Sequence, residues 1–353
     1  MTSVLFYDGV CQQPYDTRTL RTQALGGTEA TLTRVADALG ALVIQHNRTQ
    51  DWERYRSPQP LSGIRSVVVT RDSRALRAVH ARYPQARLYL WLHDRVTPGS
   101  KRARRLAGDA AALRDLSVTV LCVSDWQRAR VEATLRGFDP GARVPALRIY
   151  NPVDDALIPD ATPVDERKLA FFSSPNKGLR FTLDAFGELR RRMPDLRLVV
   201  GNPGYKDRAS ASAPGVEFLG PQPQSVMLAE VRGALCTFFP NFVIPETFGL
   251  VFAESHAVGT PVLTHDCGAA LEVIGDTRQV LPLARSVRAY EALAGALPAS
   301  WRQAPARLAA AAGLFDRYVE RIRAWRAGGR PQAGPDPRFR LSLIAQQWRQ
   351  LLA

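Results

Sequence analysis

The sequence predicts an α/β protein built from two doubly wound parallel sheets. Its 353 residues exceed the roughly 100–200 residues of an ordinary domain. Short β-branched or aromatic runs alternate with amphipathic segments, which is typical of parallel strands joined by crossover helices. The alternation restarts after a polar, proline-containing connector at about residues 151–168. We therefore expect one doubly wound domain on each side of that connector.

Each half contains its own series of expected elements. In the first half we expect strands at SVLFYDGV, ALVIQHN, SVVVT, RLYLWLHD, VTVLCVS and LRIYNPV, with helices at GGTEATLTRVADALG and WQRARVEATLRG. In the second half we expect strands at KLAFF, LRLVVGN, VEFLG, LCTFFPN, PVLTHDC and RQVLPL, with helices at KGLRFTLDAFGELRRRM and TFGLVFAESHAVG. A long helical stretch is expected at residues 305–326. The predicted domains are residues 1–160 and 168–330, followed by a helix at 339–353 that packs back near the first domain.

The charge of the chain allows two interpretations. The formal net charge is +14, and only four of the 47 basic residues are lysines. The excess either attracts an anionic partner or reflects an arginine-rich composition. The densest cluster, Lys101–Arg105, is either a solvated helix face or a contact with a membrane surface or an anionic acceptor.

Composition also bears on location and redox state. The N-terminus lacks the basic start and apolar stretch of a secretory signal, so we expect a cytoplasmic protein, with the inner face of the membrane as the second location. No apolar run approaches the ~18 residues that span a bilayer. The four cysteines have no metal-type spacing, and we expect reduced thiols.

The most informative segment is PETFGLVFAESHAVGTPVL, residues 245–263. We expect Glu246 to precede a helix opened by Thr247, Phe248 and Gly249, with Glu254 about two turns along. Unpaired amides at a helix start favour an anion such as a diphosphate. Carboxylates at either end of such an anion could bind hydroxyl groups. The segment therefore predicts a nucleotide-sugar site.

This segment resembles the retaining glycosyltransferases of family 4, which have two Rossmann-like domains facing a cleft (the GT-B fold). The resemblance lies in a glutamate, seven residues, a second glutamate and then AVGTPVL. It implies that Glu246 lies at the donor sugar and that the amides of Phe248, Gly249 and Leu250 approach the sugar and diphosphate. It also implies that Glu254 binds ribose hydroxyls. The alternative is that the two glutamates are unrelated solvated carboxylates.

A second match is SSPNKGLRFTLDAF, where Lys177 follows an apolar strand and precedes a helix. A cation in that position favours a phosphate group, although Lys177 could also be an ordinary surface lysine. The family usually has an arginine about five residues earlier, and this chain has Phe172 there. Ser173 and Ser174 with helix amides could replace that arginine, Arg180 could supply the charge, or the diphosphate could be held more weakly.

Two features of the first half also match the family. Gly26 and Gly27 precede a predicted helix, and the family's equivalent loop faces the donor; an ordinary turn is the alternative. His93 ends the expected strand RLYLWLHD, where similar enzymes have a histidine beside the donor sugar, and Asp94 could orient it. A purely structural histidine is the alternative.

The resemblance implies transfer of a sugar, with retention of configuration, from a UDP-, GDP- or other nucleoside-diphosphate sugar to an acceptor hydroxyl. We expect a saccharide or lipid-linked acceptor in cell-surface polysaccharide or glycolipid synthesis, no cofactor, and no nucleic-acid partner. No Asp-x-Asp pair occurs, so a metal-independent reaction is expected, with His93, Glu246 and Lys177 as the catalytic residues. The alternatives are a basic, non-catalytic module that binds nucleic acid or anionic membrane, and a GT-B epimerase or phosphorylase.

Overall fold

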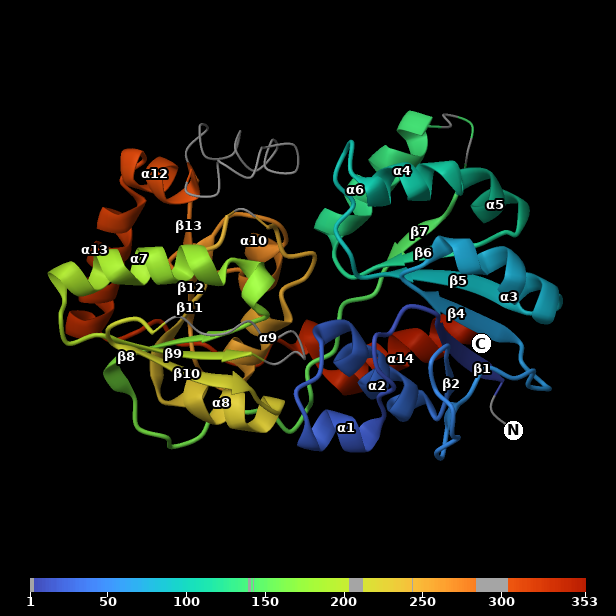
Figure 1. Ribbon diagram of the computed structural model, residues 1–353, viewed down its shortest axis with the longest axis horizontal. Coiled ribbons are helices and arrows are strands. Elements are labelled where there is room, and N and C mark those ends of the chain that lie inside the picture. Colours follow the sequence, from blue (N-terminus) through green and yellow to red (C-terminus); the bar gives the residue numbers. More distant parts are fainter. Residues whose placement is uncertain (1–2, 139–140, 142, 203–211, 243, 284–303) are drawn as a thin grey trace. The chain divides into compact units, whose positions relative to one another are not determined.

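The computed structural model describes residues 3–138, 141, 143–202, 212–242, 244–283 and 304–353 (Figure 1). Parts of the predicted second domain, residues 203–211 and 284–303, lie outside this description. The chain divides into two compact units. The first consists of Met1–Arg18, Thr28–Asp154 and Arg338–Ala353, and the second of Thr19–Gly27 and Asp155–Pro337.

The first unit is built around a seven-stranded sheet in the order β3-β2-β1-β4-β5-β6-β7. All pairings between these strands are parallel. Every residue of the central strand β4 is buried, as expected when helices cover both faces of a parallel sheet. The strands are β1 (Val4–Asp8), β2 (Leu42–Gln45), β3 (Tyr55–Arg56), β4 (Ser66–Thr70), β5 (Arg87–Leu92), β6 (Thr119–Cys122) and β7 (Ala146–Arg148).

Helices cover the sheet of the first unit (Figure 1). Leu76 and Val79, and then Leu106 and Leu113, pack with the strand residues into one apolar core. The helical elements are α2 (Gly27–Leu39), η1 (Ser73–Ala75), α3 (Leu76–Arg82), α4 (Lys101–Gly108), α5 (Ala110–Asp115) and α6 (Asp125–Phe138). A further helix, α1 (Thr17–Thr22), belongs mostly to the second unit.

The C-terminal helix α14 (Leu341–Leu352) belongs to the first unit. Its Trp348 is fully buried, with ring centroids 5.5 Å from Phe6 and 4.8 Å from Trp91. The backbone N–H of Leu341 donates to the carbonyl of Val153 at 2.9 Å. The last residues of the chain therefore complete the core around β1 and β5.

The second unit is built around a six-stranded parallel sheet in the order β10-β9-β8-β11-β12-β13. Leu169, Phe171 and Phe172, from the apolar end of β8, are buried at the centre of this sheet. The strands are β8 (Asp165–Phe172), β9 (Arg197–Asn202), β10 (Val216–Pro221), β11 (Ala234–Phe238), β12 (Val262–His265) and β13 (Val280–Leu281).

The helices of the second unit include one departure from the predicted pattern. The stretch expected as one helix at 305–326 is two helices, because Gly313 adopts a left-handed φ of 63° between them. The helical elements are η2 (Pro175–Lys177), α7 (Leu179–Arg192), α8 (Gln224–Arg232), α9 (Leu250–Ala257), α10 (Ala270–Ile274), α12 (Ala304–Ala311) and α13 (Leu314–Gly328). The short helix η4 (Pro337–Phe339) follows where the chain returns to the first unit. None of the helices within the described ranges has the length and hydropathy needed to cross a bilayer.

The predicted fold class is confirmed, since both sheets are parallel and flanked by helices. In each sheet the strand order reverses next to the strand that comes first, between β1 and β4 and between β8 and β11. Ligands of doubly wound folds bind beyond the carboxyl ends of the strands at such a reversal. The residues that follow β1, β4, β8 and β11 are therefore the expected location of a ligand site.

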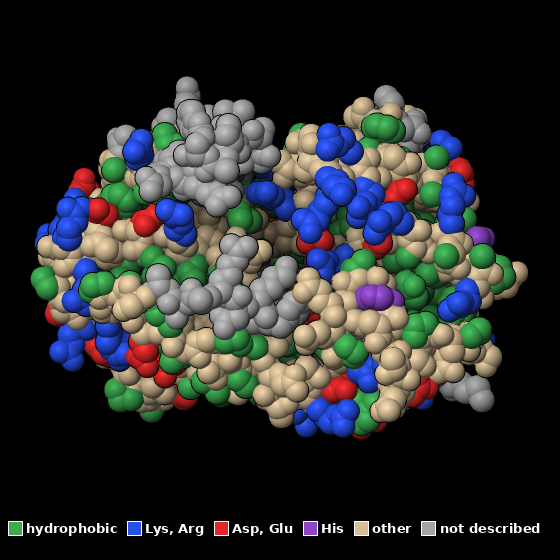
Figure 2. Space-filling view, in the orientation of Figure 1, with side chains coloured by type: hydrophobic (Ala, Val, Ile, Leu, Met, Phe, Trp, Pro, Cys, Tyr) green, Lys and Arg blue, Asp and Glu red, His purple; other side chains and the backbone are tan. Residues whose placement is uncertain are grey.

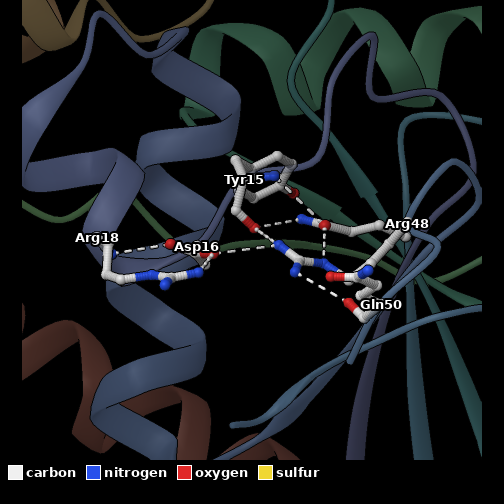
Figure 3. Close-up of polar contacts among 6 residues, drawn as sticks. Tyr15, Asp16, Arg18, Arg48 and Gln50 are labelled. Atoms are coloured by element: carbon white, nitrogen blue, oxygen red, sulfur yellow. Dashed lines mark hydrogen bonds and ion pairs between the residues drawn. The ribbon is translucent and has the colours of Figure 1, made fainter. Parts of the chain in front are cut away.

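A buried ion pair fixes the loop that follows β1 (Figure 3). Arg48 donates to the Asp16 carboxylate at 3.3 Å and to the Tyr15 carbonyl at 2.9 Å. Its Nε donates to the Gln45 side chain at 2.8 Å. Both charged side chains are less than 10% exposed. These contacts hold Gln45 of β2 and the loops after β1 and β2 together, largely shielded from solvent.

We predict that Arg48→Met lowers the free energy of unfolding by ~3 kcal/mol or more, because it leaves the Asp16 carboxylate buried with a lost partner. Urea denaturation of the purified chain measures the change. Arg18→Met is the matched control: Arg18 contacts the same carboxylate at 3.2 Å, but its side chain is 65% exposed. An exposed pair contributes ~1 kcal/mol or less. Equal losses in the two variants would contradict the prediction.

Candidate active site

Lys177 lies directly beyond the carboxyl end of β8. The turn Pro175–Lys177 leads into Gly178, which has a left-handed φ of 93° and caps the start of α7. A side chain on Gly178 would overlap the side chain of Asn241, at 2.8 Å from its Cγ. The turn therefore places a one-third exposed lysine at the strand-order reversal of the second sheet.

The structure brings Lys177 and Glu246 together. The Lys177 Nζ donates to the Glu246 carboxylate at 3.0 Å, across 69 positions of sequence. The Glu246 side chain is only 11% exposed, so the ion pair is partly shielded from water. A cation and an acid that the sequence assigned to one nucleotide-sugar site thus neutralise each other.

Gly268 fixes the backbone of Glu246. The two residues form a parallel bridge, and the N–H of Ala269 donates to the Glu246 carbonyl at 3.0 Å. A Cβ on Gly268 would lie 2.4 Å from that carbonyl oxygen, and the residue has a φ of +70°. Only glycine permits this close approach without a movement of the backbone. Gly268 therefore fixes the backbone position from which the Glu246 side chain extends.

The helix after Glu246 starts later than the sequence predicted. We expected Thr247 to Gly249 to open it, but α9 begins at Leu250. Gly249 has a φ of 90°, a left-handed conformation that no residue of a right-handed helix adopts. A Cβ there would lie 2.3 Å from the Phe252 ring. Glu246 precedes the helix, as predicted, but Thr247, Phe248 and Gly249 separate it from the first residue of α9.

Phe248, Leu250 and Glu254 have different environments. Phe248 is buried to 1% exposure, so only its backbone can face a ligand, while Leu250 is half-buried and begins α9. The Glu254 side chain is buried, and one of its oxygens accepts a hydrogen bond from the Gln224 side chain at the start of α8. Gln224 was not predicted, because a single glutamine at a helix start carries no sequence signal of its own.

The position of the missing arginine is occupied by a core residue. Phe172 is 3% exposed and forms the end of β8. Arg180 is exposed on the first turn of α7. Burial raises the pKa of Asp184, one turn further along the helix, and the Arg180 charge opposes that shift. Ser173 and Ser174 are half-buried beside Lys177. The replacement of the family's arginine by these serines and helix amides, or by Arg180, stays a prediction.

In the first unit, a charged network occupies the carboxyl ends of β4 and β5. Arg71 donates to Asp94 at 3.1 Å and lies 3.9 Å from Glu29 at the start of α2. Arg102 of α4 lies 3.2 Å from the same Asp94. Arg71 has a φ of 68°, and a left-handed non-glycine residue of this kind indicates a constrained site. Arg71 was not predicted from the sequence, although it directly follows the strand SVVVT.

His93 lies beside this network, at the end of β5, and is 8% exposed. Its ring centroid is 4.4 Å from that of Trp91. Burial and, to a smaller extent, the Arg71 charge lower the pKa of His93 to about 3, while Asp94 opposes the shift. His93 is therefore neutral at physiological pH. Its ring can donate one hydrogen bond and accept another, but it does not carry a positive charge.

Gly26 ends the loop between α1 and α2, and Gly27 is the first residue of α2. The segment Thr19–Gly27 groups with the second unit, while the rest of α2 belongs to the first. Glu29, in the first turn of α2, has a pKa raised by burial. The glycine pair thus lies where the chain passes from one unit to the other, and its ligand contact stays a prediction.

The four cysteines are free, as predicted from their spacing, and all four are buried.

Comparison with known proteins identifies the segment around Lys177 and Glu246. Residues 166–298 match the family model described as glycosyl transferases group 1. This matched segment is less than two fifths of the chain. It contains Lys177, Glu246 and Glu254, whereas His93 and the glycine pair lie outside it.

Two groups of curated proteins are similar to part of the chain. A phosphatidyl-myo-inositol mannosyltransferase of Mycolicibacterium smegmatis is 30% identical over 152 residues, which are 39% of each protein. A D-inositol 3-phosphate glycosyltransferase of Corynebacterium glutamicum is 33% identical over 149 residues, covering 36% of this chain and 34% of that protein. The chain thus spans less than two fifths of the length of these relatives.

Solved structures resemble the whole chain. The Anabaena protein Alr3699/HepE in complex with UDP-glucose has a TM-score of 0.63 at 16% identity, over 99% of both chains. Sucrose-phosphate synthase from Thermosynechococcus elongatus has a TM-score of 0.62 at 17% identity, over 99% of this chain and 98% of its own. These likenesses show the GT-B type of fold. Neither the family match nor these relatives support the binding module, the epimerase or the phosphorylase.

The neutral state of His93 predicts a pH dependence of stability. Its pKa is about 3 in the folded chain, against an ordinary value of 6.5 that holds for the unfolded chain. Between these values the unfolded chain binds an extra proton, so acid favours unfolding. Between pH 7.5 and 4.5 the wild type should therefore lose ~2–3 kcal/mol more unfolding free energy than His93→Asn. Urea denaturation at a series of pH values measures this difference, and parallel curves for the two proteins would contradict it.

Proposed function

We propose that this chain is a retaining glycosyltransferase of family 4, which transfers a sugar from a nucleoside-diphosphate sugar to an acceptor hydroxyl. The observation that carries the proposal is the contact between Lys177 and Glu246 at 3.0 Å. It lies at the strand-order reversal of the second sheet, within residues 166–298, which match the model of the group 1 glycosyl transferases. A phosphate-binding cation and a hydroxyl-binding acid therefore meet where this fold binds its ligands.

Different residues of the second unit bind different parts of the donor. Lys177 and the amides at the start of α9, from Phe248 to Leu250, bind the diphosphate, since a helix start and an ammonium both favour an anion. Glu246 accepts hydrogen bonds from the hydroxyls of the sugar. Glu254, oriented by Gln224, accepts hydrogen bonds from the ribose diol.

The reaction breaks the bond between the anomeric carbon and the diphosphate and forms one between that carbon and the acceptor oxygen. The acceptor proton leaves with the diphosphate, and the sugar passes through a state with oxocarbenium character. Lys177 and the amides near Gly249 stabilise the charge that develops on the departing diphosphate. Neutral His93 and the loop at Gly26 and Gly27 are assigned to the transferred sugar and the diphosphate by their resemblance to the family. No cofactor or metal enters this proposal.

The donor and acceptor classes are suggested by the similar proteins. UDP and UDP-glucose are bound by the Anabaena structures, and the mycobacterial relatives are named as mannosyltransferases of a phosphatidylinositol. We therefore propose a UDP- or GDP-sugar donor and a saccharide or lipid-linked acceptor, in glycolipid or cell-surface polysaccharide synthesis. A cytoplasmic enzyme would meet a lipid-linked acceptor at the inner face of the membrane, with Lys101–Arg105 of α4 as the contact.

The proposal predicts which substitutions remove donor binding. In a thermal-shift and hydrolysis screen of UDP-, GDP- and ADP-sugars, the wild type should be stabilised by at least one of them. Glu254→Ala should weaken that binding by about tenfold or more, since it removes hydrogen bonds to a charged acceptor. Lys177→Ala should lower transfer by ~100-fold or more.

Glu217→Ala is the control, because it removes a glutamate of the same unit that is 61% exposed and lies on β10, away from Lys177. It should bind the donor like the wild type. A wild type that binds none of these sugars, or a Lys177→Ala variant with full turnover, would refute the proposed function.

A further inference from the structure

The first unit contains a pocket at the carboxyl ends of three neighbouring strands. Its volume is about 160 Å³. It is lined by Val10 after β1, by Arg71, Asp72 and Ser73 after β4, by Leu92, Asp94 and Val96 at the end of β5, and by Arg102, Arg105 and Leu106 of α4. This is the strand-order reversal of the first sheet, where a doubly wound fold binds its ligand.

A second, more polar pocket of about 370 Å³ adjoins the first. The two share Arg102 and Arg105, which lie on α4 one turn apart. Basic side chains gather over the α4 region of this unit in the space-filling view (Figure 2). The second pocket is lined by Arg95, Thr97, Ser100, Lys101, Arg102 and Arg105.

The two pockets have an excess of positive charge that their own acids do not balance. Five cationic side chains and two carboxylates line them. Asp94 is already shared by Arg71 and Arg102, and Asp72 pairs with Arg74 at 2.8 Å. Arg105 is half-buried, and within the described part of the chain no carboxylate lies at ion-pair distance from it. Arg105 can therefore turn to an added anion, and Arg102 can join it if Asp94 keeps its contact with Arg71.

The surroundings of these arginines strengthen their interaction with an anion. Leu92, Val96 and Leu106 are each at most 6% exposed and form an apolar floor. A low local dielectric raises the strength of a charged hydrogen bond. Arginine also presents a planar fork of donors that matches phosphate oxygens in pairs.

We propose that Arg102 and Arg105, with Arg71 behind them, bind a phosphate group of the acceptor. That the phosphate belongs to the acceptor rests on the proposed function, whereas the anion site itself rests on the geometry of the two pockets. The smaller pocket is below the ~300–1,000 Å³ of a complete ligand site, and so it fits a single substituent such as a phosphate. The larger pocket leaves room for the group that carries it. Binding draws Arg102 from Asp94 towards the phosphate.

The test is a calorimetric titration of glycerol 3-phosphate, with glycerol as the neutral comparison. Wild type should bind the phosphate and not glycerol. Arg105→Gln should weaken binding by about tenfold or more, as expected for the loss of charge-assisted hydrogen bonds. Arg104→Gln is the matched control, since it removes the same charge from the same helix and lines neither pocket. It should change the affinity by less than about twofold.

Lys177→Gln separates this site from the donor site, and it should leave glycerol 3-phosphate binding intact. Equal losses in Arg104→Gln and Arg105→Gln would show diffuse charge and overturn the proposal, as would a loss confined to Lys177→Gln or no binding by the wild type. If the wild type binds glycerol 3-phosphate but no nucleotide sugar, the proposed function fails while the anion site remains.

A parallel arm distinguishes a lipid phosphate from a soluble one. Vesicles of phosphatidylcholine with phosphatidylinositol replace glycerol 3-phosphate, and pure phosphatidylcholine vesicles are the comparison. Vesicle binding that Arg105→Gln reduces by about tenfold more than Arg104→Gln does supports a lipid phosphate in the pocket. Vesicle binding that both variants reduce equally indicates surface attraction alone and contradicts a pocket for the headgroup.

Discussion

The ion pair between Lys177 and Glu246 is the interaction on which the candidate site depends. It joins the turn after β8 to the segment after β11, so that two stretches far apart in sequence share one end of the second sheet. The left-handed glycines Gly178 and Gly268 permit the close approaches that position both side chains. Each charge compensates the other, which lowers the cost of burying Glu246. A diphosphate that binds Lys177 would release Glu246 to accept hydroxyl groups.

Most of the fold could be predicted from hydrophobic patterning. Runs such as SVVVT and KLAFF are buried central strands in the structure, because both faces of a parallel sheet are covered. The two-residue strand β3 was missed, since Tyr55–Arg56 is too short to show a period. The break between α12 and α13 was also missed. It depends on the conformation of Gly313, and an isolated glycine within a helical pattern does not by itself reveal a left-handed turn.

The candidate site was predicted only where a motif marks it. Lys177, Glu246 and Glu254 were identified from local sequence, and the structure places the first two in contact. Their partners come from elsewhere in the chain: Gly268 supports Glu246 and Gln224 binds Glu254. Such contacts depend on tertiary structure, which spacing along one segment does not encode. The predicted start of α9 was three residues too early, because helix propensity does not show that Gly249 has a positive φ. In the first unit, Arg71 was also missed. The sequence does not show its left-handed backbone conformation, and its acidic partners are distant from it in sequence.

The most direct test of the account is a crystal structure of the chain bound to a nucleoside diphosphate. We predict that Lys177 lies within hydrogen-bond distance of the β-phosphate, that its contact with Glu246 is broken, and that Glu254 accepts hydrogen bonds from the ribose. A nucleotide bound elsewhere, with the contact between Lys177 and Glu246 still at about 3.0 Å, would contradict the account.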